Sequence, residues 1–128
     1  MIQLPDLFDY DTAVVKFRVN GADHSAVVRS LRTPEAQRAI KAFADSRKLS
    51  QEPLTVTEEV TDDYGITEQV ERQTELGRKL TARLCGGLVA STDCDNMPAV
   101  LLESSDLCDA IYHAAAMLAA DFAAKKKT

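Results

Sequence analysis

Residues 13–30 alternate apolar and polar side chains with the period of two that is typical of a half-buried β-strand. The pair Asn20-Gly21 interrupts this alternation, and it favours the backbone conformation of a tight hairpin turn. The pattern therefore predicts a β-hairpin over residues 13–30. Because two strands alone are marginally stable in water, helices of the same chain or strands of another copy are needed to cover the apolar face.

Three later segments repeat apolar residues with helical spacing, and they predict three main helices. The first begins after Thr33, a favourable N-cap followed by proline, and its apolar stripe includes Phe43. The second is expected over residues 66–90, with leucines on one face and charged residues opposite. The third, over residues 105–127, is rich in alanine and carries aspartates at its start and lysines at its end, as the helix dipole favours.

The segments between these elements are predicted from their composition. Residues 49–65 are acidic and contain a proline and a glycine, so we interpret them as a solvated loop, with a short strand over residues 54–60 as the alternative. The whole chain then has an α+β fold, in which an N-terminal β-hairpin precedes a predominantly helical body. Its expected parts are a flexible N-terminal arm (1–12), a single α+β domain (13–124) and a basic tail (125–128).

The last predicted helix is apolar on two sides. One side is suited to the core, while the opposite side carries alanines and a methionine where a solvated helix would carry charges. A helix with two apolar sides usually has two neighbours. We therefore expect contact with a partner or with another copy of the chain, through Ala110, Ala114, Met117, Ala124 and Phe122.

Composition limits the classes of function. The chain has 128 residues and a formal net charge of −5, which argues against binding nucleic acid through an overall basic field. No apolar run approaches the 18 or so residues of a membrane span, and the acidic N-terminus does not resemble a secretory signal. We expect no nucleic-acid partner and no membrane partner.

Residues with catalytic or metal-binding chemistry are few. Cys85, Cys94 and Cys108 lack the spacing of zinc ligands, and we interpret them as free thiols in a reducing cytoplasm. Both histidines, His24 and His113, are interpreted as ordinary polar residues. The sequence contains neither a glycine-rich phosphate loop nor the spacing of a calcium-binding loop. We expect no catalytic residues, no metal and no cofactor.

Three stretches together resemble a known family. They are V-K-F-R-V-N-G-A-D-H-S-A-V-V-R-S, then T-P-E-A-Q-R-A-I-K-A-F, and finally E-L-G-R-K-L-T-A-R-L-C-G-G-L-V-A-S followed by S-S-D-L-C-D-A-I-Y-H. Their order and spacing resemble those of the tail assembly chaperones of bacteriophages with long, non-contractile tails. The resemblance extends over residues 13–122.

The resemblance implies a function in tail morphogenesis. A chaperone of this family would oligomerise and bind the helical tape-measure protein before the tail tube polymerises. It would act in the host cytoplasm and would be absent from the mature virion. Two alternatives are a structural head–tail or tail-tube component, and a small cytoplasmic enzyme that uses Cys85 or His113.

Overall fold

The computed structural model describes residues 12–126, with side chains as far as Phe122. Residues 1–11 of the expected N-terminal arm lie outside this range. So do residues 127–128 and the remaining side chains of the expected basic tail, while the helix backbone continues to Lys126.

The predicted N-terminal hairpin is confirmed. Strands β1 (Thr12–Val19) and β2 (Ala22–Arg29) pair antiparallel, from Thr12 opposite Arg29 to Val19 opposite Ala22. The turn residues Asn20 and Gly21 have φ angles of 51° and 82°, as a tight hairpin turn requires. The sequence analysis did not identify a third strand, β5 (Val89–Thr92), which pairs with β2 and completes a sheet of order β1-β2-β5.

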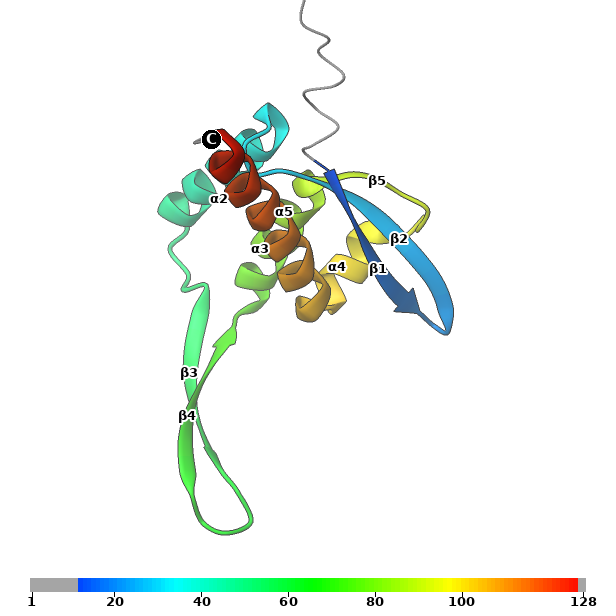
Figure 1. Cartoon of the computed structure of the whole chain (residues 1–128). Coiled ribbons are helices and arrows are strands. Elements are labelled where there is room, and N and C mark those ends of the chain that lie inside the picture. The colour runs from blue at the N-terminus through cyan, green and yellow to red at the C-terminus, as the bar shows by residue number, and fades with distance from the viewer. Residues whose placement is uncertain (1–11, 127–128) are drawn as a thin grey trace, which may run out of the picture.

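Helices cover the apolar face of this sheet (Figure 1). The helices are α2 (Pro34–Leu49), α3 (Glu75–Leu88), α4 (Met97–Glu103) and α5 (Ser105–Lys126). Helix α5 packs against β1 and β2 on one side and against α3 and α4 on another, so its apolar residues have neighbours on two sides within the chain. The buried core lies between the sheet and the helices, and its largest fully buried side chains are Leu88, Ile111, Val28 and Cys85.

The first predicted helix is confirmed, but its apolar stripe is less buried than expected. The Thr33 side chain accepts a hydrogen bond from the amide of Ala36 and caps α2. Ala36 is fully buried, whereas Phe43 is half-buried and contacts a small pocket between α2 and α3. Among the described elements, α2 packs mainly against α3.

The region around residues 49–90 differs most from the prediction. Strands β3 (Thr55–Thr61) and β4 (Thr67–Gln73) form a second, two-stranded antiparallel sheet, where the sequence analysis favoured a loop and the start of a long helix. Helix α3 begins at Glu75, nine residues later than predicted. The alternative of a short strand within residues 54–60 is the one the structure bears out.

The α+β class is therefore correct, while the number of helices is not. Within residues 12–126 the structure contains four helices and five strands in two antiparallel sheets. The additional helix is the short α4, whose Leu101 is buried in the core while Leu102 remains largely exposed. A single seven-residue helix is too short to show helical periodicity in a sequence.

Candidate functional site: surfaces for protein partners

The outward side of α5 is the first candidate surface. Ala110, His113, Met117 and Ala120 are exposed, and they recur at intervals of three, four and three residues. We call these four residues the outer α5 face. This spacing brings side chains into one line along the helix, which is the geometry that packs against another helix. Small side chains along such a line allow a neighbouring helix to approach closely.

The predicted contact residues occupy different environments. Ala110 is exposed and Met117 is 48% exposed, whereas Ala114 is half-buried and packs against the core. Phe122 is half-buried beneath the guanidinium of Arg32, which lies 3.9 Å from the ring centre. The side chain of Ala124 lies outside the described residues.

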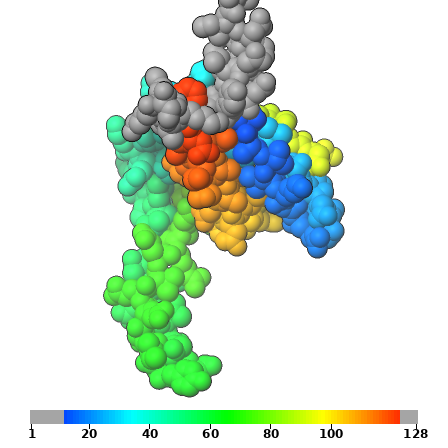
Figure 2. Space-filling view, viewed as in Figure 1, coloured from blue at the N-terminus to red at the C-terminus, as the bar shows by residue number. Residues whose placement is uncertain are grey.

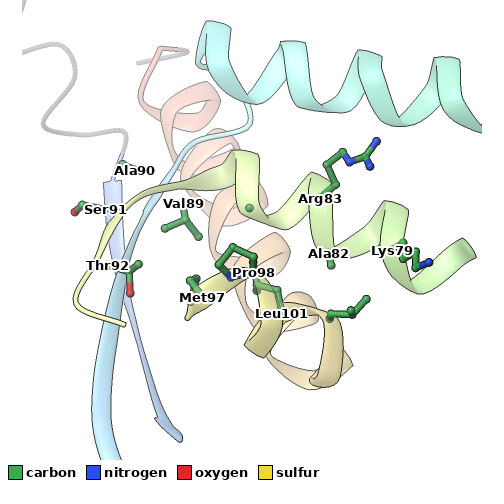
Figure 3. A pocket seen from close by; sticks show the side chains of 12 residues that line it. Lys79, Ala82, Arg83, Val89, Ala90, Ser91, Thr92, Met97, Pro98 and Leu101 are labelled. Atoms are coloured by element: carbon green, nitrogen blue, oxygen red, sulfur yellow. The ribbon is translucent and has the colours of Figure 1, made fainter. Parts of the chain in front are cut away.

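The second candidate surface is a groove of about 630 Å³ between α3, α4 and β5 (Figure 3). Val89 of β5 and Met97 of α4 face each other across its apolar floor, and Pro98 and Leu101 extend that floor along α4. We call it the α3–α4–β5 groove. The sequence analysis missed it, because β5 and α4 are too short to be recognised from periodicity.

The groove has a basic rim. Among the described residues that line it, Lys79 and Arg83 are cations and none is a carboxylate. The ammonium of Lys79 lies 3.2 Å from the carboxylate of Glu75, one turn earlier on α3. No described carboxylate lies within 4.0 Å of the Arg83 guanidinium. The Arg83 side chain is directed toward α2, away from Met97 and Leu101 (Figure 3), and it also lines the small pocket between α2 and α3.

The groove also contains the edge of a sheet. Four consecutive residues, Val89–Thr92, line it, and successive side chains of a strand point to opposite faces. Because all four consecutive residues of β5 line the groove, β5 presents its edge, and not one of its two faces, to the groove. Strand β5 pairs with β2 on one side and ends the described sheet on the other. The amide of Val89 bonds the carbonyl of Gly86, and the carbonyl of Val89 accepts from Arg29, so an extended segment could pair with the rest of this edge, Ala90–Thr92.

The third candidate surface is the hairpin formed by β3 and β4, which stands clear of the body (Figure 2). We call residues 54–73 the acidic hairpin. Directly paired residues share a face, so one face carries the apolar residues together with Glu58, Glu68 and Arg72, and the other carries only threonine, glutamine and glutamate. We call the first the apolar face. The apolar residues are Val56, Val60, Ile66 and Val70.

The base of the acidic hairpin is fixed to α3. The Thr74 side chain accepts a hydrogen bond from the amide of Gly77 and donates one to the carbonyl of Pro53, while its own amide bonds the carbonyl of Leu54. A Cβ on Gly77 would collide with that Leu54 carbonyl. Glycine is therefore required here for the chain to pass close to the start of α3, and it holds the hairpin in one direction relative to the helix.

The two residues considered for catalysis, Cys85 and His113, border the same furrow between α3 and α5. The Cys85 thiol is buried and donates a hydrogen bond to the carbonyl of Cys108. Its hydrogen bond with the Cys108 thiol, and then burial, raise the pKa of Cys85, which disfavours the nucleophilic thiolate. Cys108 also borders this furrow, which has a volume of about 340 Å³. Within the described residues, no group of three or more histidine, cysteine or acidic side chains is placed to hold a metal ion.

His24 has a structural environment instead. Its ring stacks near that of Phe17, and its Nδ1 lies 3.4 Å from the carboxylate of Asp93. The amide of Ser25 donates to the same carboxylate, and this hydrogen bond is the main cause of the lowered pKa of Asp93. These contacts connect the segment after β5 to β2.

Comparison of the chain with protein-family models, with curated proteins and with solved structures found no match. None of the helices in the described part of the chain combines the length and the apolar composition that crossing a membrane requires.

Proposed function

We propose that the chain is a tail assembly chaperone that binds the helical tape-measure protein along its outer α5 face. The resemblance over residues 13–122 suggests the client. The observation that carries the binding site is the exposed line of two alanines, a methionine and a histidine along α5. From Ala110 to Ala120 the outer α5 face is about 15 Å long, so it offers about three turns of contact to one client helix.

The chemistry of the face fits a helical client better than a small molecule. The outer α5 face is a convex helix surface rather than a concave pocket, and specific small-molecule sites are usually concave. An amphipathic client helix could place its apolar stripe along Ala110 and Met117. The apolar stripe of the client would then be covered in the complex until the tail tube polymerises.

Co-expression of the chain with the tape-measure protein tests this function. The wild-type chain should keep the tape-measure protein soluble and should co-purify with it. The double variant Ala110→Glu/Met117→Glu should lose both effects, because two carboxylates would be buried against an apolar stripe. Lys41→Glu, an exposed change on α2, is the matched control and should behave as wild type.

Thermal unfolding of the free variants distinguishes loss of binding from loss of folding. Exposed substitutions usually change stability by less than about 0.5 kcal/mol, so both variants should unfold close to the wild-type temperature. A tape-measure protein that stays insoluble with the wild-type chain, or that is solubilised equally by the double variant, would contradict the proposal. Presence of the chain in purified virions would favour the structural-component alternative.

A further inference from the structure

We propose that the acidic hairpin of one copy seats its apolar face in the α3–α4–β5 groove of a second copy. This inference concerns surfaces other than the outer α5 face. It therefore stands or falls independently of the tape-measure protein. It would supply the repeated copies that a long helical client needs.

The acidic hairpin has an apolar face that its own chain leaves uncovered. Val56, Val60 and Ile66 are 39%, 41% and 57% exposed, although valine and isoleucine are among the residues most often buried in folded proteins. An isolated two-stranded sheet is marginally stable in water without a cover on its apolar face. A partner surface that covers this face would therefore stabilise the hairpin as well as the complex.

The chain's excess negative charge is concentrated in the same hairpin. Residues 54–73 contain six carboxylates and one arginine, a net charge of −5, which equals the formal net charge of the whole chain. The remaining residues contain fourteen carboxylates and fourteen cations and are neutral overall. The partner surface should therefore be apolar with a positive rim.

The α3–α4–β5 groove has these properties. Its floor is apolar, its charged lining residues are Lys79 and Arg83, and it presents the open edge of β5. Glu58, Glu68 and Arg72 lie on the same face of the hairpin as its valines. Glu58 pairs with Arg72 at 3.0 Å, so Glu68 is the carboxylate of this face that could meet a cation beside the groove. The edge of β5 offers backbone groups to an extended strand such as β3 or β4.

The hairpin of the same copy is not the occupant. Hydrogen bonds from Thr74, together with one from Gln73 to Thr81, fix its base at the start of α3. From there the hairpin extends away from α4 and β5 (Figure 1), whereas the groove lies between these two elements and α3, along residues Lys79 to Gly86. With strands of seven residues, about 23 Å long, the hairpin can reach into a neighbouring copy.

Sedimentation velocity of the full chain tests the inference, with two lysine substitutions as a matched pair. Val60 and Thr57 lie on opposite faces of β3, and each is paired with a glutamate of β4, Glu68 and Glu71 respectively. Val60→Lys and Thr57→Lys therefore make the same charge change in the same cross-strand setting. At about 100 µM, well above the Kd of a micromolar interface, the wild type and Thr57→Lys should sediment with at least twice the 14.0 kDa of one chain. Val60→Lys should sediment as a single chain.

A mixing experiment tests whether the contact joins two different surfaces, the hairpin of one copy and the groove of another. Leu102→Lys places a charge in the groove at a position that is 39% exposed, and it should also sediment as a single chain. The Val60→Lys copy retains an intact groove and the Leu102→Lys copy retains an intact hairpin. Mixing the two should therefore restore a two-chain species, because one functional contact remains.

Several results would overturn the inference. They are a wild-type chain that sediments as a monomer at this concentration, equal disruption by Thr57→Lys and Val60→Lys, or a mixture that stays monomeric. Circular dichroism checks that each variant is folded, and Val60→Thr replaces Val60→Lys if the lysine variant is not. Solubilisation of the tape-measure protein by the monomeric Val60→Lys chain measures the proposed function separately.

Discussion

Two adjacent glycines near the end of α3 give opposite predictions for the same substitution. A Cβ on Gly87 would lie 2.6 Å from the Cβ of Ala39 in α2, so one of the two helices would have to move. A Cβ on Gly86 would meet the nearest atom, Cδ1 of Leu101, at 3.8 Å, which is an ordinary van der Waals distance. We therefore expect Gly87→Ala to destabilise the fold and Gly86→Ala to stabilise it.

The magnitudes follow from two opposing effects. Alanine is preferred to glycine in a helix, and at a compatible site this change stabilises a protein by about 0.4–1 kcal/mol. Nothing opposes that gain at Gly86. Overpacking costs about 1–3 kcal/mol, so Gly87→Ala should lower the free energy of unfolding by up to about 2 kcal/mol after the helix gain is included.

Urea unfolding followed by far-ultraviolet circular dichroism measures both values, provided that the transitions are two-state. The variants should be compared at a protein concentration at which the chain is monomeric, because Gly86 lines the α3–α4–β5 groove and self-association adds to apparent stability. Equal stability of Gly86→Ala and Gly87→Ala would refute the close packing of α2 on α3. A stabilised Gly87→Ala would refute it more strongly.

Further predictions concern the core, the hairpin base and pH. Ile111→Ala, at a fully buried position, should cost about 2–5 kcal/mol in urea unfolding, whereas Phe43→Ala, at a half-buried position, should cost less. Thr74→Ala should cost about 1–2 kcal/mol because it removes the cap of α3, and it should make the hairpin amides exchange faster by hydrogen-exchange mass spectrometry. The lowered pKa of Asp93 means that its ionised form stabilises the fold above the ordinary pKa of 3.8 and that this contribution is lost as the pH falls through the folded-state value. The urea midpoints of wild type and Asp93→Asn should therefore differ at pH 7 and converge at the lowest pH at which the chain remains folded.

The parts of the fold that could be predicted are those with strong local signals. Asn20-Gly21 specifies a tight turn between alternating strands, and Thr33-Pro34 specifies the start of a helix. Helix α5 is long and rich in alanine, so its propensity and periodicity agree. Tertiary contacts were not needed to identify any of these elements.

The prediction of one helix over residues 66–90 failed because residues 67–73, which form β4, have local features that are also typical of a helix. Glu68 and Arg72 have the spacing of a helical ion pair, but in the structure Arg72 instead pairs with Glu58 across β3 and β4, at 3.0 Å. Thr74 is the actual N-cap, and Glu75 and Lys79, which have the same spacing within α3, do form an ion pair, at 3.2 Å. The boundary therefore depends on the pairing of β4 with β3, which no pattern within residues 66–90 reveals.

The candidate surfaces also differ in how far they could be predicted from the sequence. Alanine and methionine on the outward side of α5 could be identified from helical periodicity, although Ala114 turns inward enough to pack against the core. The α3–α4–β5 groove could not be identified, because it joins residues from three elements, two of which are short. The acidic composition of residues 54–73 was visible, but its separation into an apolar and a polar face depends on the strand register.

Site-specific photo-crosslinking measures the proposed client contact most directly. A benzophenone amino acid at position 117, on the outer α5 face, is compared with the same group at position 41 on α2, during co-expression with the tape-measure protein. The account predicts a covalent adduct with the tape-measure protein from position 117 and little or none from position 41. Equal adducts from both positions, or an adduct from position 41 alone, would contradict binding along α5.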